Sequence, residues 1–281
     1  MRTWGDARTF ATVRLRSAPD PSTAALDADV LLAHALGVGR EALYAHPERQ
    51  LSAAEAARFQ QLVERRGRGE PVAYLRGFKE FYGLRFQVDP RVLIPRPETE
   101  VLVDAARERI AGRSLRVVDV GTGSGAIAVA IAAHEHGVRI IATDSSRDAI
   151  VVAEANALAN GVADRVEFRH GDLLAPITER VDIVCANLPY LRDDTVTEWV
   201  GERSSLAFEP REAVVAGADG LGLIRRCIAD LSRVLAAHGA ALFECDPPQT
   251  TAVTQMLERS GLRTRTVRDL TRAERVVIAD S

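Results

Sequence analysis

The four residues Asn187-Leu188-Pro189-Tyr190 follow an apolar stretch at 181–186 and suit one kind of chemistry. A planar NH2 group is a poor nucleophile because its lone pair is delocalised into the neighbouring π-system. Accepting hydrogen bonds from both of its N–H groups would localise that lone pair, and the Asn187 side-chain oxygen and the Leu188 carbonyl are candidate acceptors. Pro189 restricts Leu188 to extended conformations, which fixes its carbonyl, and Tyr190 offers a flat face for stacking. The tetrapeptide predicts a site that positions a planar amino group without a general base.

A glycine-rich segment at 117–125 is a second candidate site, because it reads G-x-G-x-G directly after an apolar run. Glycines let the backbone approach a ligand, and the start of the following helix offers free N–H groups. A dinucleotide fingerprint would read G-x-G-x-x-G. The departure disfavours a pyrophosphate and fits S-adenosylmethionine, whose sulfonium and amino group carry positive charge and no phosphate. The residues predicted to contact this cofactor are Gly121, Thr122, Gly123, Ser124 and Gly125.

Three more residues are candidates for contacts with the same cofactor. Asp144 lies 19 residues after Gly125, at the end of the next apolar run, where its carboxylate could hold the ribose hydroxyls. Asp172 and Leu173 follow a third apolar run. Asp172 could accept from the adenine amine and Leu173 could pack on the ring, although a turn capped by Asp172 is the alternative. We expect Asn187 to contact the cofactor as well as the target.

These segments can act together only if one sheet brings them to a common edge. From residue 115 onward the sequence alternates between strand and helix patterns, which predicts a mostly parallel sheet covered on both faces. Open sheets of this kind bind ligands at the carboxyl ends of their strands. The predicted strands are 115–120, 139–143, 166–169, 181–186 and 240–244, with a closing hairpin at 263–267 and 275–279. The predicted helices are 126–133, 148–160 and 221–237.

The chain before this region has a different pattern. An apolar-periodic stretch stops at Gly37, and Ser52 with Glu55 forms a capping box that opens a helix running to about Arg66. Residues 71–93 alternate and are rich in aromatic side chains, with Gly83 as a turn, which predicts a β-hairpin. We therefore predict three parts. They are a small helical domain over 1–70, a linking hairpin over 71–93 and an α/β domain over 94–281.

Composition narrows the classes of function. The chain has 281 residues, 47% of them hydrophobic and 27% charged, as in an ordinary globular protein. It has no apolar run of membrane-spanning length and no signal peptide at its start, so we expect a cytoplasmic protein with no membrane partner. The net charge is +3 over 1–85 and −6 over 86–281, which makes a nucleic-acid partner unlikely. Neither the three cysteines nor His134 and His136 have zinc spacing, so no metal is expected.

Several segments carry the pattern of one protein family, and the most specific is the Pro-Arg-Pro-Glu-Thr-Glu stretch at 95–100. On these residues the chain resembles the bacterial release factor glutamine methyltransferases over nearly its whole length. The resemblance implies a class I S-adenosylmethionine-dependent methyltransferase fold, Rossmann-like with a mostly parallel seven-stranded sheet, behind an N-terminal helical domain that helps dock the substrate. It also implies transfer of a methyl group to the glutamine N5 of the Gly-Gly-Gln loop in peptide chain release factors, with S-adenosyl-L-homocysteine as by-product. The matching segments are 71–77, 79–84, 92–100, 119–125, 208–211, 217–221 and 275–278.

Two positions depart from the family pattern. The family's tetrapeptide is usually Asn-Pro-Pro-Tyr, and Leu188 here replaces the first proline. We expect activity to persist, because the carbonyl remains and Pro189 still restrains it. The family's Glu-Ile-Gly is here Glu244-Cys245-Asp246 followed by Pro247, so any cofactor contact of that loop stays open. Residues 95–100 should form a rigid helix start, and the family suggests that they also wall the active site.

Two other functions stay open. Asn-Leu-Pro-Tyr also occurs in ribosomal RNA adenine dimethyltransferases, so N6-methylation of adenine in ribosomal RNA or DNA is the first alternative. Against it stand the helical domain, the stretch at 95–100 and the lack of a basic excess. The second alternative is a catalytically idle module that binds cofactor or partner.

Overall fold

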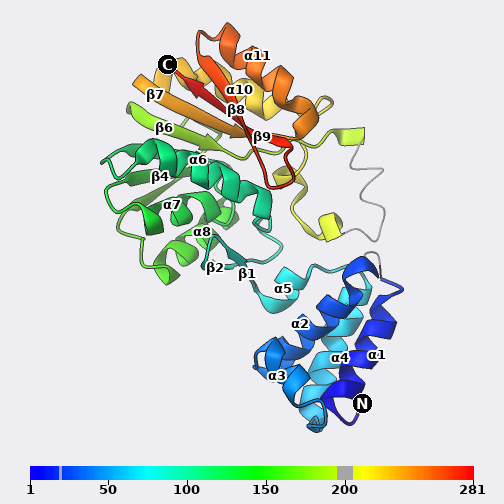
Figure 1. The fold of residues 1–281 in the computed structure, drawn as a ribbon. Coiled ribbons are helices and arrows are strands. Elements are labelled where there is room, and N and C mark those ends of the chain that lie inside the picture. The colour runs from blue at the N-terminus through cyan, green and yellow to red at the C-terminus, as the bar shows by residue number, and fades with distance from the viewer. Residues whose placement is uncertain (19–20, 195–204) are drawn as a thin grey trace. The chain divides into compact units, whose positions relative to one another are not determined.

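The structure is a computed structural model that describes residues 1–18, 21–194 and 205–281 (Figure 1). The chain divides into two compact units, and each is described by itself. The first unit comprises Met1–Phe78 with a later segment that includes residues 205–209. The second comprises the described parts of Lys79–Val196 and Pro210–Ser281.

The first unit is helical. Its core consists of apolar side chains from α1, α2 and α4, among them Trp4, Leu31 and Phe59. The predicted capping box is confirmed, since the Ser52 hydroxyl accepts from the Glu55 N–H and the Glu55 carboxylate accepts from the Ser52 N–H. The helices are α1 (Trp4–Leu15), α2 (Ala24–Leu36), α3 (Arg40–Ala45), α4 (Ala53–Gly67) and α5 (Val72–Arg76).

The hairpin predicted over 71–93 is shorter in the structure and spans Phe78–Gln87. Residues 72–76 form helix α5, which ends at Gly77 in the left-handed conformation, so placing them in a hairpin was wrong. Pro71 and Gly77 bracket this short helix, which buries Tyr74 and Leu75. The hairpin itself joins β1 (Phe78–Phe81) to β2 (Leu84–Gln87) through Tyr82 and Gly83, both with positive φ. Phe81 and Phe86 lie in the core of the second unit, so the hairpin packs as part of that unit.

In the second unit, seven strands of the described residues form one sheet in the order β5-β4-β3-β6-β7-β9-β8. The first five strands in this order are parallel to their neighbours, and β9 is antiparallel to both β7 and β8. The predicted strands and the closing hairpin are confirmed, but β7 begins at Leu235, so the helix predicted over 221–237 ends three residues too late. The strands are β3 (Arg116–Val120), β4 (Arg139–Asp144), β5 (Val166–His170), β6 (Val181–Ala186), β7 (Leu235–Glu244), β8 (Arg263–Arg268) and β9 (Glu274–Asp280).

Helices cover both faces of this sheet (Figure 1), and an apolar cluster lies on each face. On one face α6 and α7 pack with the hairpin against β3, β4 and β6, and on the other face α10 and α11 pack against β6, β7 and β9. Helix α7 has buried residues all round, which explains its uninterrupted apolar sequence. The sequence pattern missed α11. The helices are α6 (Glu100–Ile110), α7 (Ala126–His134), α8 (Arg147–Ala159), α10 (Gly222–Val234) and α11 (Thr250–Arg259).

The strand register places the candidate residues at one edge of the sheet. Val120 pairs with Thr143 on one side and with Ala186 on the other, so the chain leaves β3, β4 and β6 at the same level. Ala186 in turn pairs with Phe243 of β7. The glycine loop (Gly121–Gly125), Asp144 and the tetrapeptide (Asn187–Tyr190) therefore all lie at neighbouring strand ends, as the strand–helix alternation predicted.

Candidate functional site

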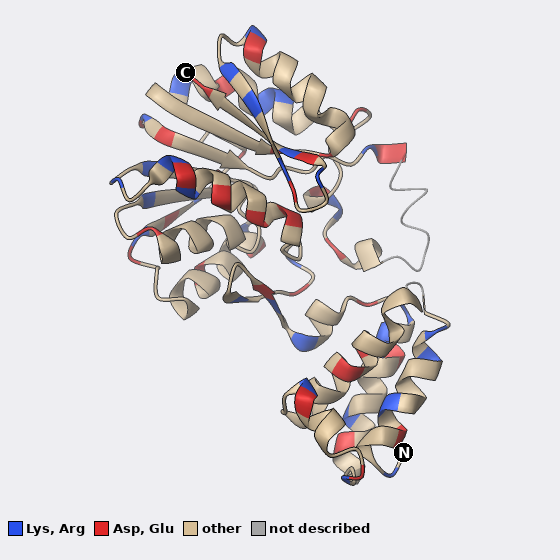
Figure 2. Cartoon of the chain, viewed as in Figure 1, with Lys and Arg blue, Asp and Glu red and all other residues tan. Residues whose placement is uncertain are grey.

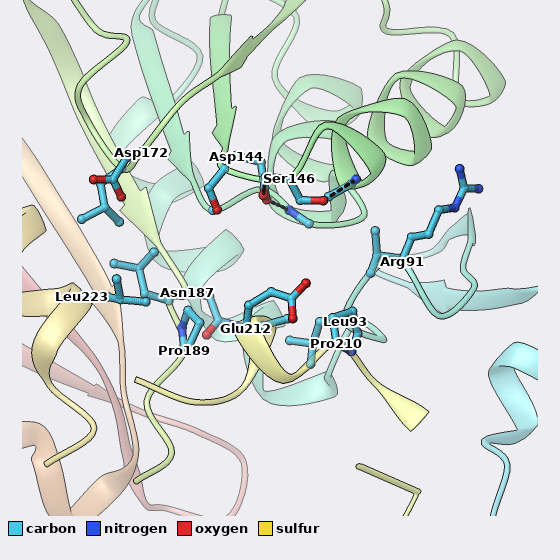
Figure 3. Close-up of a pocket in the computed structure, with 18 residues that line it drawn as sticks. Arg91, Leu93, Asp144, Ser146, Asp172, Asn187, Pro189, Pro210, Glu212 and Leu223 are labelled. Carbon is cyan, nitrogen blue, oxygen red and sulfur yellow. Dashed lines mark hydrogen bonds between the residues drawn. The ribbon is translucent and has the colours of Figure 1, made fainter. Parts of the chain in front are cut away.

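A pocket opens at the carboxyl ends of β3, β4 and β6 (Figure 3). It encloses about 740 Å3 of space, its open mouth included. In Figure 3, Asp144, Ser146 and Asp172 line one side, and Asn187, Pro189 and Pro210 line the other. The predicted residues that line the pocket are Gly121, Gly123, Asp144, Asp172, Leu173, Asn187, Leu188 and Pro189.

The glycine loop presents its backbone to the pocket and turns its side chains inward. Gly121 and Gly123 line the pocket with φ of 70° and 54°, a region that favours glycine. Thr122 and Ser124 are buried, and neither they nor Gly125 line the pocket, although all three were predicted to contact the cofactor. Thr122 and Ser124 support the loop from its buried side. The Thr122 hydroxyl donates to the carboxylate of Asp119 at 2.6 Å.

Asp144 ties the end of β4 to the glycine loop. Its Oδ2 accepts from the Gly123 N–H at 2.8 Å, and its Oδ1 accepts from the Ser146 N–H at 2.9 Å. Burial raises the pKa of this carboxyl, while the two backbone hydrogen bonds lower it. Each carboxylate oxygen keeps a further acceptor site. The arrangement therefore leaves room for the predicted bonds from two ribose hydroxyls.

Asp119, which directly precedes the glycine loop, is not among the residues predicted from the sequence. It is fully buried, and its Oδ2 accepts from the Thr122 hydroxyl and the Ala128 N–H. Its Oδ1 has no hydrogen-bond partner among the described residues. Burial raises the pKa of Asp119 to about 6. Asp119 does not line the pocket itself, but its carboxyl supports the glycine loop from behind, and the loop backbone together with Asp144 fits S-adenosylmethionine.

Asp172 and Leu173 follow β5, where the third apolar run predicted them. Leu173 has φ of 47°, and its carbonyl accepts from the Thr143 hydroxyl at 2.9 Å, which holds the turn against β4. The Asp172 carboxylate is half-exposed and ion-paired with Arg226 of α10. Both side chains line the pocket, so their predicted contacts with the adenine stay possible and remain predictions.

The tetrapeptide directly follows β6, and a residue far away in the sequence hydrogen-bonds to its first residue, Asn187. The Asn187 Nδ2 donates to the Thr99 hydroxyl at 2.9 Å. Thr99 lies in the Pro-Arg-Pro-Glu-Thr-Glu stretch, where a 3-10 turn over Pro97–Thr99 leads into α6, so the predicted helix start is confirmed. Leu188 is buried, and a Cβ built on Gly121 would lie 3.0 Å from its Cδ2. The leucine that replaces the family's proline therefore packs against the glycine loop.

Tyr190 does not line the pocket, but its backbone is held firmly. Its carbonyl accepts from the Gln249 Nε2 at 2.9 Å. Gly220, with φ of 69°, packs so closely that a Cβ there would lie 2.2 Å from the same carbonyl. Gln249 also forms a capping box with Asp246, so the loop that departs from the family pattern supports the tetrapeptide. Burial raises the pKa of the Tyr190 phenol to about 12, which keeps the ring neutral.

Ten residues that line the pocket were not among the predicted site residues. Some lie in segments that carry the family pattern, at 92–100 and 208–211, and that pattern was the signal that could have found them. Within the described residues, no three His, Cys, Asp or Glu side chains gather to hold a metal ion, and no helix combines the length and apolarity needed to cross a membrane. The ten are Arg91, Val92, Leu93, Ser145, Ser146, Ala149, Pro210, Glu212, Ala213 and Leu223.

Several solved structures resemble the chain in fold. The 16S rRNA N2 G1207 methyltransferase of T. thermophilus, solved with AdoMet and guanosine, has a TM-score of 0.51 and 18% identity, over 73% of this chain and 49% of that chain. A methyltransferase from Pyrococcus furiosus has a TM-score of 0.54 and 13% identity, over 77% of this chain and 98% of that chain. At these identities the likeness establishes the fold, which is the class I methyltransferase fold predicted from the sequence.

Sequence comparison is more specific. The family model described as the PrmC N-terminal domain matches residues 6–77, and the model described as the methyltransferase small domain matches residues 97–204. A curated relative, the release factor glutamine methyltransferase of Xylella fastidiosa (strain 9a5c), is 41% identical over 256 residues, which are 90% of this chain and 92% of that protein. Since this identity extends along nearly the whole chain, the chain belongs to the release factor glutamine methyltransferase family.

Proposed function

We propose that this protein transfers a methyl group from S-adenosylmethionine to the side-chain nitrogen of the glutamine in the Gly-Gly-Gln loop of peptide chain release factors. One observation carries the proposal. Asn187, Leu188 and Pro189 line the same pocket as the backbone of Gly121 and Gly123. An acceptor pair for an amide NH2 thus stands beside a loop built to receive a ligand.

At the cofactor end, the glycine backbone and Asp144 would hold S-adenosylmethionine, and the buried Asp119 would support the glycine loop from behind. When bound, S-adenosylmethionine supplies an electrophilic methyl group. Asp144 contributes the acceptor sites that its bonds to Gly123 and Ser146 leave unused. Asp172 and Leu173 would border the adenine from the turn after β5.

At the target end, the Asn187 Nδ2 is bonded to Thr99, so the Asn187 Oδ1 remains as an acceptor for the substrate NH2. The Leu188 carbonyl is the second acceptor, and Pro189 restrains it. Tyr190 directly follows and is the proposed stacking surface for the planar amide, although its side chain does not line the pocket itself. Most of the acceleration would come from positioning in a site that excludes water.

The substrate class follows from the family. The Xylella relative is named for release factor glutamine, and the helical region that matches the PrmC N-terminal domain is the proposed docking domain over residues 1–70. Figure 2 shows acidic and basic residues interspersed on the helices of both units, which does not favour a nucleic-acid backbone as partner. Because the proposed substrate is a translation factor, the proposed place of action is the cytoplasm.

Transfer of tritiated methyl from S-adenosylmethionine to purified release factor tests the proposal. We expect label on the wild-type factor, and none on a factor whose Gly-Gly-Gln glutamine is replaced by alanine. Ribosomal RNA in a parallel reaction should stay unlabelled. Label on RNA alone would support the adenine methyltransferase. Cofactor binding with no transfer to either substrate would support an idle binding module.

A further inference from the structure

The carboxyl of Glu244 is buried beside the tetrapeptide and has no role in the chemistry described so far. Only 1% of Glu244 is exposed, and its Oε2 has no hydrogen-bond partner among the described residues. It lies at the end of β7, and because Ala186 pairs with Phe243, Asn187 and Glu244 are the next residues along two neighbouring parallel strands. A polar group in such a place calls for an explanation.

Thr99 lies between these two residues. Its side chain is buried, a hydrogen bond from it lowers the pKa of the Glu244 carboxyl, and its Oγ1 accepts from the Asn187 Nδ2 at 2.9 Å. Thr99 ends the 3-10 turn before α6, Asn187 directly follows β6, and Glu244 ends β7, so the contact exists only in the folded unit. The result is a short chain of hydrogen bonds that ends at a residue lining the pocket.

The direction of these bonds is set by donor and acceptor chemistry. When Glu244 is ionised, as at about pH 8, its carboxylate can only accept, so the Thr99 hydroxyl must donate its single proton to it. The Thr99 oxygen is then left with lone pairs and can only accept from Asn187. Asn187 must therefore turn its NH2 toward Thr99 and keep its oxygen for another partner. Without the carboxylate, Thr99 could donate to the Asn187 oxygen, and the amide could rotate by half a turn.

We infer that Thr99 and Glu244 are positioning residues that fix the amide of Asn187 with its oxygen available to the substrate, an inference that rests on the proposed function. Burial raises the pKa of Glu244 to about 7, while the Thr99 hydrogen bond and the charge of Arg275 lower it and Glu98 raises it. Burying a carboxylate in this environment costs free energy. Its effect on the orientation of the Asn187 amide accounts for its presence.

The orientation can be observed directly, because the chain contains only three asparagines, Asn156, Asn160 and Asn187. Protein labelled with 15N-asparagine gives three side-chain NH2 signals, and Asn187→Ala identifies one of them. At about pH 8 the Asn187 NH2 should exchange slowly with solvent in the wild type and about tenfold faster in Thr99→Val, as expected for the loss of one hydrogen bond. Thr99→Ser should restore slow exchange. The buried Asn156 signal is the internal reference, since its amide bonds to other segments.

Glu244→Gln tests the direction of the chain of bonds, because a glutamine can donate as well as accept. Asn187 exchange should speed up severalfold in this variant. The matched control is Glu98→Gln, which removes a charge close to Glu244 from an exposed side chain outside the hydrogen-bond chain. The control should leave exchange at the wild-type rate. Unchanged exchange in both Thr99→Val and Glu244→Gln would overturn the inference.

Single-turnover methylation of release factor is the second measurement. Thr99→Val should lower the rate about tenfold, equivalent to about 1.4 kcal/mol, with the Kd for S-adenosylmethionine unchanged and with recovery in Thr99→Ser. An equal loss in Thr99→Ser would show that the methyl packing matters and not the hydroxyl, which contradicts the inference. If the wild type itself fails to methylate release factor, the proposed function fails, while the exchange measurement still decides the orientation of Asn187.

Discussion

The two ends of the pocket are built in different ways. At the cofactor end, the contacts are between backbone groups and one side chain of adjacent strand ends, such as Gly121 and Thr122 donating to the Thr143 carbonyl, each at 2.9 Å. At the target end, side chains from distant segments hold the tetrapeptide. Asn187 bonds to Thr99, which is 88 residues away, and the Tyr190 carbonyl bonds to Gln249, which is 59 residues away.

This difference indicates which end tolerates change. Backbone contacts depend on glycine conformation and strand register, so they survive most side-chain substitutions nearby. The target end depends on individual hydroxyl, amide and carboxyl groups, each of which one substitution can remove. We therefore expect target-end substitutions to reduce the rate of transfer and cofactor-end substitutions to reduce affinity.

The largest expected effect is that of Asn187→Ala, which should lower single-turnover methylation of release factor by about 10²–10³, because one aimed acceptor is lost from a preorganised site. Cofactor affinity should largely persist, since the glycine loop and Asp144 are unchanged. The melting temperature and the rate are measured on the same sample. Near-normal turnover by folded protein would refute the mechanism.

Asp144→Ala tests the other end and should weaken S-adenosylmethionine binding by roughly 1–3 kcal/mol, because the charge-assisted bonds to the ribose are lost. Calorimetry measures the change. Asp172→Ala is the comparison variant, because it removes a half-exposed carboxylate of the same pocket that is already paired with Arg226, and its effect should be smaller. Equal effects of the two variants would contradict the assignment of Asp144 as the residue that binds the ribose.

A third prediction concerns stability at the target end. The folded-state pKa of Glu244 is about 7 against an ordinary value of 4.5, so between these values the folded protein binds more protons and the free energy of unfolding falls as pH rises. Glu244→Gln should therefore be more stable than the wild type by about 1–3 kcal/mol at high pH, and the difference should vanish below the ordinary pKa. The raised pKa of Asp119 has the same effect on stability. Because Asp119 is present in both proteins, its contribution cancels in the difference. Denaturant unfolding across this range measures the difference, and a constant difference would contradict the assignment.

The smallest expected effect is that of Leu188→Pro, which restores the family's usual residue. The carbonyl is unchanged, so activity should stay within about tenfold, or about 1.4 kcal/mol of barrier. The contact of the leucine with Gly121 is lost, and a modest drop in melting temperature should follow. Collapse of the rate to background in a folded variant would show that the leucine side chain or its N–H is needed, and would favour a different substrate.

The same contrast explains what the sequence could predict. The glycine loop, Asp144 and the tetrapeptide each carry a signal within a few residues of a strand end, so alternation and motif placed them correctly at one edge. Thr99, Gln249 and Glu244 carry no local sign of their contacts, because these depend on which strands become neighbours. The segment at 72–76 was assigned to a hairpin because aromatic alternation outweighed the short helix signal of Pro71 and Gly77.

Asn156 of α8 joins two parts of the second unit that the chain places far apart. Its fully buried amide donates to the Gln87 and Ser124 carbonyls and accepts from the Gln87 N–H, so one side chain holds both the end of the hairpin and the glycine loop. Local unfolding of either segment must break bonds to the same amide. The two segments should therefore open as one cooperative unit, and a ligand that protects the glycine loop should also slow amide exchange in the hairpin.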